Sequence, residues 1–187
     1  RDHQMRDPIA AARIVRDTVC NSVASLASGE AGIVLMLSGG LDSSVLAAAL
    51  TRQDVPVTCI TLVTGDATGD ERRYARQVCA ALGLSLVEGW RDLAGIDVGR
   101  SDARGLPRPT ERMFFQESRR LCEQAAAEAG ATAIFNGGGG DNIFCSLRSG
   151  APAADRLLTG GSGFLSTVRD LSHLTQESRQ TVMMDAV

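Results

Sequence analysis

The 187-residue sequence contains no lysine, and all 19 of its basic residues are arginines. A Walker A loop ends in Gly-Lys-Ser or Gly-Lys-Thr, so that kind of nucleotide site is excluded. The arginines are scattered along the chain, and the formal net charge is −3. A nucleic-acid groove requires clustered positive charge, so we expect no nucleic-acid partner.

Paired cysteines are also missing. The five cysteines are odd in number and widely spaced, without a Cys-x-x-Cys motif: Cys20, Cys59, Cys79, Cys122 and Cys145. We expect them to be reduced and mainly to fill the protein interior. The sequence shows neither a secretory signal nor an apolar run long enough to cross a bilayer. These absences predict a cytoplasmic chain without membrane contact.

The most informative segment that is present is Ser38-Gly39-Gly40-Leu41-Asp42-Ser43-Ser44. It lies between the apolar run 33–37 and the Ala/Leu-rich stretch 45–50, which predicts a strand, a tight turn and a helix. Backbone N–H groups at a helix N-terminus attract anions, and glycines allow an anion to approach closely. Asp42 beside that anion suggests a bridging Mg²⁺ ion. The alternative, a glycine turn with a Ser or Asp helix cap, requires one such residue rather than seven.

Strands and helices alternate along the first 150 residues. Helices are expected at 8–27, 43–52, 68–82 (with Thr68 and Glu71 as a capping box), 111–129 and 143–148. Strands are expected at 33–37, 55–63, 84–87 and 131–135, and residues 91–110 are expected to form a loop. This order predicts an α/β fold, in which helices sandwich a parallel sheet of five strands or fewer.

A second glycine-rich loop, Asn136-Gly137-Gly138-Gly139-Gly140-Asp141-Asn142, follows the last of these strands. Parallel sheets bind ligands beyond the carboxyl ends of their strands, where both loops are expected to lie. Asp141 is therefore a second candidate metal ligand, with a role as helix N-cap as its alternative. The two loops together predict one ligand site rather than two unrelated turns.

The C-terminal part has a different pattern. Residues 151–187 show helical patches and no strand, so we divide the chain into a domain at 1–150 and a helical region that begins at 151. The apolar pattern continues to the last residues without a stop signal. We therefore expect the chain to be part of a longer protein, with the helical region truncated.

Four motifs together resemble the synthetase domain of asparagine synthetases. They are the two glycine-rich loops, the strand end Val63-Thr64-Gly65, and the segment Asp70-Glu71-x-x-Tyr74-Ala75. This family belongs to the ATP-pyrophosphatase (PP-loop) superfamily and includes β-lactam synthetases and lasso-peptide cyclases. The resemblance covers residues 8–150. It implies a fold like that of adenine nucleotide α hydrolases, with an ATP-binding synthetase domain.

The resemblance also implies a reaction and a set of site residues. The reaction is ATP-dependent amide formation through an acyl-adenylate, with release of AMP and pyrophosphate. The residues implied at the pyrophosphate are Ser38, Gly39, Gly40, Asp42, Ser43 and Ser44. Those implied at the adenine are the backbone of Leu37 or Leu35 and the backbone of Val63, and Gly137 is implied near the ribose or the α-phosphate. The implied Mg²⁺ ligands are Asp42 and Asp141.

Two departures from asparagine synthetases concern the second loop. Gly138 stands where that family carries a glutamate associated with its amine chemistry, and Asn142 stands where it carries a second acid. Such a loop resembles that of lasso-peptide cyclases, whose amine is a peptide N-terminus. The carboxylate substrate is thus either free aspartate, giving asparagine, or a peptide that is closed to a macrolactam.

Two further departures concern what the chain does not contain. The family's catalytic lysine follows the second loop, and this sequence has no lysine, so no residue is assigned a catalytic role and weak catalysis is expected. The family's glutamine-hydrolysing domain precedes this region, so a glutaminase domain or a separate amine source would lie outside this chain. A nucleotide-binding module without catalysis is the remaining alternative.

Overall fold

The computed structural model describes residues 7–66, 69–97, 99, 115–140, 150–160 and 162–186. These residues divide between two compact units, Arg1–Gly138 and Gly139–Val187. The sequence predicts a division of the chain at residue 150, twelve residues after Gly138. Residues 141–149, between the two divisions, are outside the described part.

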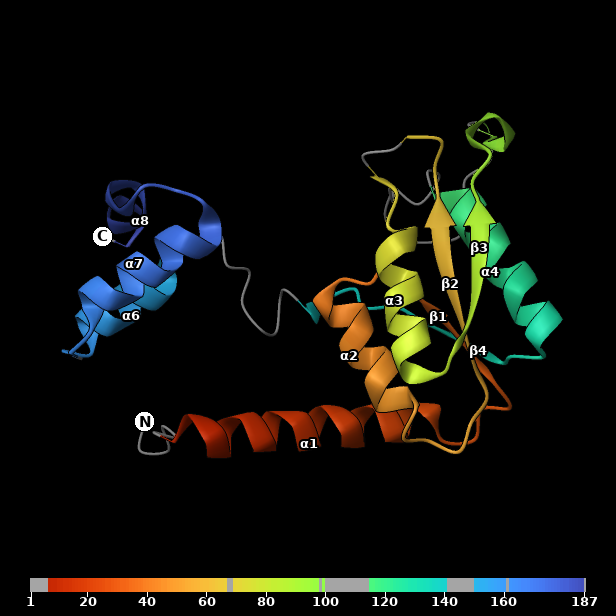
Figure 1. The fold of residues 1–187 in the computed structure, drawn as a ribbon, viewed down its shortest axis with the longest axis horizontal. Coiled ribbons are helices and arrows are strands. Elements are labelled where there is room, and N and C mark those ends of the chain that lie inside the picture. Colours follow the sequence, from red (N-terminus) through yellow and green to blue (C-terminus); the bar gives the residue numbers. More distant parts are fainter. Residues whose placement is uncertain are drawn as a thin grey trace. The chain divides into compact units, whose positions relative to one another are not determined.

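Unit 1 is built on four parallel strands in the order β3-β2-β1-β4. The strands are β1 (Ile33–Met36), β2 (Val57–Val63), β3 (Ser85–Trp90) and β4 (Ala133–Phe135). The helices are α1 (Pro8–Ala27), α2 (Leu41–Leu50), α3 (Arg72–Leu82) and α4 (Gln116–Ala129), with a short 3₁₀ helix, η2, at Leu93–Gly95. Figure 1 shows α2 and α3 on one side of the sheet and α4 on the other. The predicted α/β fold with a parallel sheet between helices is confirmed.

The side chains of β1 alternate between two buried layers. Ile33, Leu35 and Leu37 pack with residues of α1, α2 and α3, whereas Val34 and Met36 pack with residues of α4. Strands of a parallel sheet are covered on both faces, which explains the continuous apolar run in this part of the sequence. Because β1 pairs with β2 on one side and β4 on the other, it is a central strand. Because β1 is hydrogen-bonded on both sides, the start of the loop that follows it is held in place relative to the sheet.

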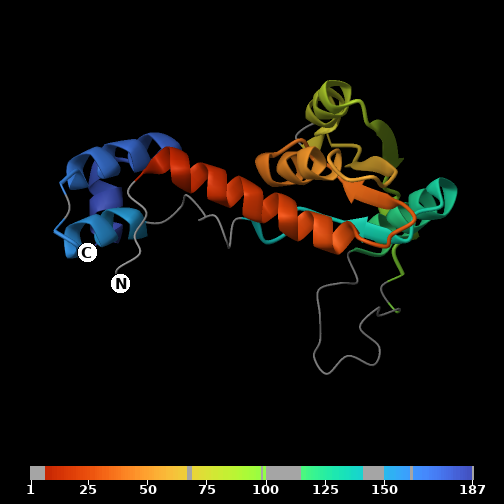
Figure 2. The same ribbon diagram turned by 90° about the horizontal axis from the view of Figure 1, so that it is seen from below.

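Helix α1 has the bounds predicted for it, Pro8–Ala27. Asp7 caps it, because the Oδ1 atom of Asp7 accepts a hydrogen bond from the Ile9 N–H at 2.9 Å, and a proline suits the first helical position. Only the C-terminal half contributes buried residues, and Ile9 and Val15 in the other half are 65% and 47% exposed. Figure 2 shows that this N-terminal half extends beyond α2.

Helix α3 begins later than the sequence predicts. Its N-cap is Glu71, without a side-chain capping bond, and its first residue is Arg72. The Arg72 N–H is bonded instead to the Asp70 Oδ1 atom at 3.1 Å. Thr68, the first half of the predicted capping box, lies outside the described residues. Asp70, two residues ahead of Arg72, thus accepts from an N–H of the first turn, the kind of bond that was predicted for the Thr68 side chain.

Other boundaries also differ from expectation, and β3 extends to Trp90 rather than ending at Val87. Helix α2 begins at Leu41 rather than Ser43, β2 begins at Val57 rather than Val55, and β4 begins at Ala133 rather than Ala131. The N–H of Ala131 is bonded to the Ala126 carbonyl at 2.8 Å, so this residue closes α4 instead of opening the strand. The predicted helix residues 111–114 and 143–148 lie outside the described part of the chain.

The four described cysteines are free and lie in the predicted elements. Cys59 and Cys79 belong to the buried layer between the sheet and α3, and Cys122 faces the other side of the sheet. Burial, with Cys79 close by, raises the pKa of the Cys59 thiol to about 12. The prediction of reduced packing residues is confirmed for these four.

Unit 2 contains three helices in its described part, α6 (Ala151–Leu158), α7 (Phe164–Thr175) and α8 (Arg179–Asp185). They share one small apolar core, made of Ala153, Val168, Leu171, Val182 and Ala186. The unit is helical, as expected for the region after residue 150. None of the helices in the described residues has the length and apolar character required to span a membrane.

Candidate functional site

The loop after β1 is held against the first turn of α3. Gly39 has φ +84°, a left-handed conformation that side chains rarely adopt. A Cβ atom on Gly39 would collide with the Tyr74 Cβ atom and would lie 2.6 Å from the Tyr74 carbonyl carbon and 2.8 Å from the Ala75 nitrogen. The loop is thus in backbone contact with α3, and only glycine fits at this position.

The same loop forms the N-terminus of α2. Gly40 is the N-cap and provides no side chain to satisfy the N–H groups of the first turn. The Gly40 carbonyl accepts hydrogen bonds from the Ser44 N–H at 3.1 Å and from the Ser44 hydroxyl at 2.7 Å. The Ser38 and Ser43 hydroxyls share a bond of 3.1 Å. The N–H groups ahead of Ser44 thus lack helical acceptors, the arrangement that binds anions at helix N-termini.

The second glycine-rich loop meets this helix end directly. A Cβ atom on Gly137 would lie 2.9 Å from the Ser43 nitrogen and 3.2 Å from the Asp42 Cβ atom. The two loops therefore approach each other backbone to backbone at the carboxyl edge of the sheet, as the topology predicts. The N–H of Gly138 is bonded to the Asn136 Oδ1 atom at 2.9 Å, which fixes the turn after β4.

Leu37 and Val63, the residues implied at the adenine, lie at the same edge on neighbouring strands. Each is only 1% exposed. The Leu37 N–H donates to the Ile60 carbonyl at 2.8 Å, and the Val63 carbonyl accepts from the Arg91 N–H at 2.9 Å. Leu35, the other residue considered for the adenine, is fully buried within β1. These three residues are buried beneath the carboxyl edge of the sheet. The accessible groups at this edge belong to the two glycine-rich loops.

Asp42 lies in the first turn of α2, beside the unbonded N–H groups. Its predicted partner Asp141 lies outside the described residues. That the two carboxylates share one metal ion therefore stays a prediction. Among the described residues, no three His, Cys, Asp or Glu side chains are close enough to form a metal site on their own. A carboxylate beside phosphate oxygens is nevertheless how Mg²⁺ is commonly held, so Asp42 fits this ion when a phosphate supplies further oxygens.

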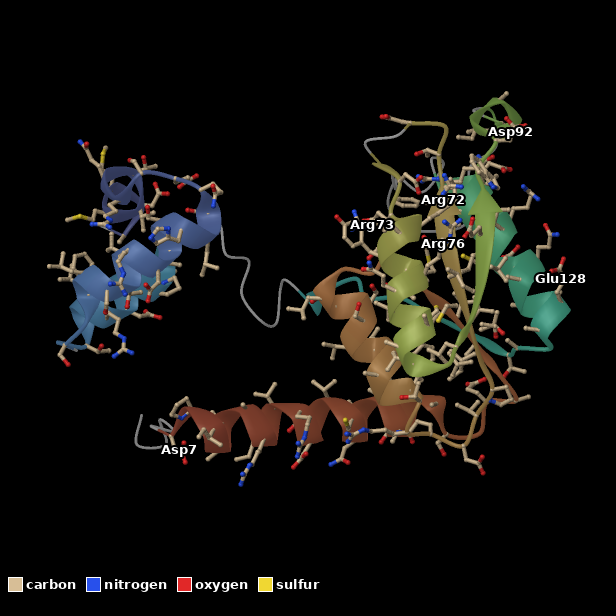
Figure 3. All side chains as sticks on the ribbon, in the orientation of Figure 1. Asp7, Arg72, Arg73, Arg76, Asp92 and Glu128 are labelled. Atoms are coloured by element: carbon tan, nitrogen blue, oxygen red, sulfur yellow. The ribbon has the colours of Figure 1, made fainter. Side chains whose placement is uncertain are left out.

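A network of acids and arginines lies beside α3 and β3, and the sequence reasoning missed it. Arg72 donates to both carboxylate oxygens of Asp70 at 2.8 and 2.6 Å, and its guanidinium carbon lies 4.8 Å from the centre of the Trp90 ring. Arg76 donates to both oxygens of Glu88 at 2.6 and 2.9 Å. Figure 3 shows Arg72 and Arg76 on the side of α3 nearest β3. The four-residue spacing of the two arginines in a helix was the available signal.

This network makes the stability of unit 1 depend on pH. The hydrogen bonds from the side chain and backbone of Arg72 hold the pKa of Asp70 at about 2, below its ordinary value of 3.8. A lowered pKa adds stability at pH values above 3.8, and that stability is lost as the pH falls through 2.

We expect Asp70→Asn to flatten the fall in the urea midpoint of unfolding over this range, measured by circular dichroism. An Arg72→Met background removes the guanidinium bonds but keeps the backbone N–H bond to Asp70, so it should reduce the difference between Asp70 and Asn; a difference of undiminished size there would contradict the assignment.

The ends of the segment between η2 and α4 are joined by a pair of hydrogen bonds, which we call the Asp97–Gln116 clamp. The Asp97 N–H donates to the Gln116 Oε1 atom at 3.2 Å, and the Gln116 Nε2 atom donates to the Asp97 carbonyl at 2.9 Å.

Glu117, the residue after Gln116, has a side chain that is only 8% exposed. Its carboxylate accepts hydrogen bonds from Arg120 and, at 3.4 Å, from the Asp92 N–H. The hydrogen bonds from Arg120 lower the pKa of the Glu117 carboxyl.

The fold and this edge define an α/β protein with two glycine-rich loops around a helix N-terminus of the kind that can accept an anion. The chain belongs to the asparagine synthase family, because the family model described as Asparagine synthase matches residues 14–184. The family uses ATP, and the match identifies an asparagine synthase-like ATP-pyrophosphatase domain. The resemblance stated from the motifs is confirmed at this level, and the match continues past residue 150.

Comparison with curated proteins finds no match. Among solved structures, the chain is similar to an NH₃-dependent NAD synthetase from Campylobacter jejuni, with 19% identity, a TM-score of 0.45, and coverage of 65% of this chain and 55% of the synthetase. It is also similar to a U34-tRNA thiolase, NcsA, from Methanococcus maripaludis, with 16% identity, a TM-score of 0.45, and coverage of 81% and 52%. The chain thus spans about half the length of these proteins.

Proposed function

We propose that this domain forms an amide bond at the expense of ATP, through an acyl-adenylate. A substrate carboxylate oxygen attacks the α-phosphorus of ATP, the bond to the β-phosphate bridging oxygen breaks, and pyrophosphate leaves. An amine then attacks the acyl carbon, and AMP and a proton are released. Membership of the asparagine synthase family supports this reaction class.

The observation that carries the proposal is the contact between the two loops at the N-terminus of α2. Gly39 allows the first loop to pack on α3, and Gly137 allows the second loop to reach Ser43. The unbonded N–H groups between them suit the pyrophosphate part of ATP, and they are held in place before the ligand arrives. Donors that are already oriented stabilise phosphate charge without further reorganisation.

Asp42 is the residue proposed to hold Mg²⁺ in this domain, with Asp141 as its partner from the second loop. When bound, the ion would neutralise phosphate charge as it develops on the leaving pyrophosphate. The role of the chain's own residues is to orient the phosphates. Ser38, Ser43 and Ser44 offer hydroxyls at the loop, and Gly137 limits access to the helix end from the other side.

The acyl substrate proposed first is free aspartate, the substrate that the family resemblance implies. A glutaminase domain or a separate amine source outside this chain would then supply ammonia. Gly138 favours a second candidate, closure of a peptide to a macrolactam, because it has no carboxylate where asparagine synthetases carry a glutamate. Pyrophosphate release with free aspartate, but not with a peptide that has an internal Asp or Glu, would rule out the macrolactam reaction.

The absence of lysine supports one further candidate, a nucleotide-binding module without catalysis. A module of this kind would bind MgATP tightly and form no AMP in the presence of any carboxylate and amine. AMP formation measured by chromatography therefore separates it from both ligases, and detection of AMP would exclude it.

The metal-binding role is tested by Asp42→Asn. Because the amide keeps the shape of the side chain but removes its charge, we expect Mg²⁺-dependent ATP binding to be abolished, while circular dichroism stays unchanged. Isothermal titration calorimetry with ATP in the presence of Mg²⁺ or EDTA measures this effect. Asp54→Asn, which changes an exposed carboxylate in the turn before β2, is the matched control; equal MgATP affinity in both variants would rule out the role of Asp42.

A further inference from the structure

Arg91 follows β3 directly at the carboxyl edge of the sheet. Its backbone N–H donates to the Val63 carbonyl at 2.9 Å, so sheet hydrogen bonding fixes its position although β3 ends at Trp90. Asp92, the next residue, is labelled at this edge in Figure 3. Arg91 therefore shares the edge with the two glycine-rich loops.

The side chains of β3 alternate between α3 and α4. Glu88 and Trp90 contact arginines of α3. A Cβ atom on Gly89 would lie 3.3 Å from the Leu121 Cδ1 atom, which belongs to α4. Since strand side chains repeat with a period of two, Arg91 continues the row of Gly89 on the α4 side. It is thus directed away from the acid–arginine network of α3.

The Nε atom of Arg91 is buried and has no hydrogen-bond partner. Within the described part of the chain, it is the single buried side-chain nitrogen or oxygen in this state. Three arginines of α3 and α4 are different, because Arg72, Arg76 and Arg120 each donate two bonds to a carboxylate. A buried donor without an acceptor is costly and rare, and it points to a partner that the described residues do not supply.

We propose that Arg91 binds an anionic oxygen of a ligand at this edge, a carboxylate or phosphate oxygen. A guanidinium donates charge-assisted hydrogen bonds to both, in a geometry that suits their paired oxygens. Its position favours the carboxylate. β3 lies two strands from β1, roughly 10 Å at the usual strand spacing, and the loop after β1 is the one assigned to the pyrophosphate. Arg91 is therefore assigned to the acyl substrate, an assignment that rests on the proposed function.

The direct test observes the Arg91 Nε–H group by nuclear magnetic resonance in ¹⁵N-labelled protein. Its signal is assigned by its loss in Arg91→Lys. We expect the signal to move when L-aspartate or a blocked aspartyl amide is added in the presence of MgATP, and to stay in place with inorganic pyrophosphate alone. Movement with pyrophosphate would reject the carboxylate and identify phosphate as the ligand. A signal that none of these probes moves would overturn the proposal.

Calorimetry on the variants gives a second measurement. Arg91→Met and Arg91→Lys should each weaken binding of the carboxylate probe about tenfold or more, because lysine keeps the charge but has no Nε–H at that position. Affinity for MgATP should stay within about twofold of the unchanged protein. Arg13→Met, which removes an exposed arginine from α1, is the matched control. Equal carboxylate affinity in the Arg91 and Arg13 variants would contradict the proposal.

The two proposals can fail separately. If the unchanged chain binds no MgATP, while the Arg91 Nε–H signal still responds to a carboxylate, the proposed function is wrong; Arg91 then still binds a carboxylate, but its assignment to the acyl substrate of that reaction falls. If MgATP binds normally and the Nε–H signal responds to no probe, the role of Arg91 is wrong and the proposed nucleotide site is unaffected.

Discussion

Gly39→Ala is expected to destabilise unit 1 by about 2–5 kcal/mol, the sum of two costs. A left-handed conformation costs a non-glycine residue roughly 1–2 kcal/mol, and displacing packed backbone costs about 1–3 kcal/mol. Both apply here, because φ is +84° and the new Cβ atom would meet main-chain atoms of Tyr74 and Ala75. Urea unfolding followed by the fluorescence of Trp90, the only tryptophan, measures the change in the free energy of unfolding.

Gly29→Ala is the matched control for this prediction. Gly29 has nearly the same backbone conformation, φ +86°, but a Cβ atom there would have no atom within 4 Å. Gly29→Ala should therefore lower the free energy of unfolding only by the cost of the left-handed conformation, roughly 1–2 kcal/mol. If the two substitutions destabilise the protein equally, the contact between the first loop and α3 adds nothing to stability, and the expected position of Gly39 against α3 is wrong.

Gly137→Ala is expected to weaken MgATP binding at least tenfold, which corresponds to about 1.4 kcal/mol of binding free energy. The added Cβ atom would lie 2.9 Å from the Ser43 nitrogen, closer than such atoms approach, so the second loop must move off the first turn of α2. Because both loops lie against the same nucleotide in the proposed site, their separation removes contacts from one ligand. Calorimetry with MgATP and with pyrophosphate measures the effect.

Gly138→Ala tests whether this effect is specific to position 137. Its Cβ atom would meet only the side chain of Asn136, whose amide group can rotate away with loss of its bond to the Gly138 N–H but without moving the backbone at Ser43. MgATP affinity should therefore change less than about twofold. Comparable losses at both positions would mean that any disturbance of the second loop weakens binding, and the close contact with Ser43 would then have no special role.

Much of unit 1 could be predicted because its signals are local. The apolar run at 33–37 must be buried on both faces, and Asp7 and Pro8 together fix the start of α1. Parallel strands with glycine-rich loops place those loops at one edge by topology alone. Both loops lie there in the structure, although the distance between Gly137 and Ser43 could not be read from the sequence.

The features that sequence reasoning missed depend on partners distant in the chain. Arg72 starts α3 beside Asp70 but also contacts Trp90, at the end of the next strand. Arg91 looks like an ordinary surface arginine until its backbone bond to Val63 and its unbonded Nε atom are known. Neither contact has a fixed spacing in sequence, so no motif could have predicted it.

The Asp97–Gln116 clamp has a consequence for how this fold can diversify. Because it ties the two ends of the intervening segment together, the sheet and α4 do not depend on how much chain lies between them. In general, each doubling of the length of chain between two joined ends costs only about 0.6 kcal/mol of closure entropy. Insertions or replacements between Asp97 and Gln116 should therefore leave the sheet, α4 and the two glycine-rich loops unchanged.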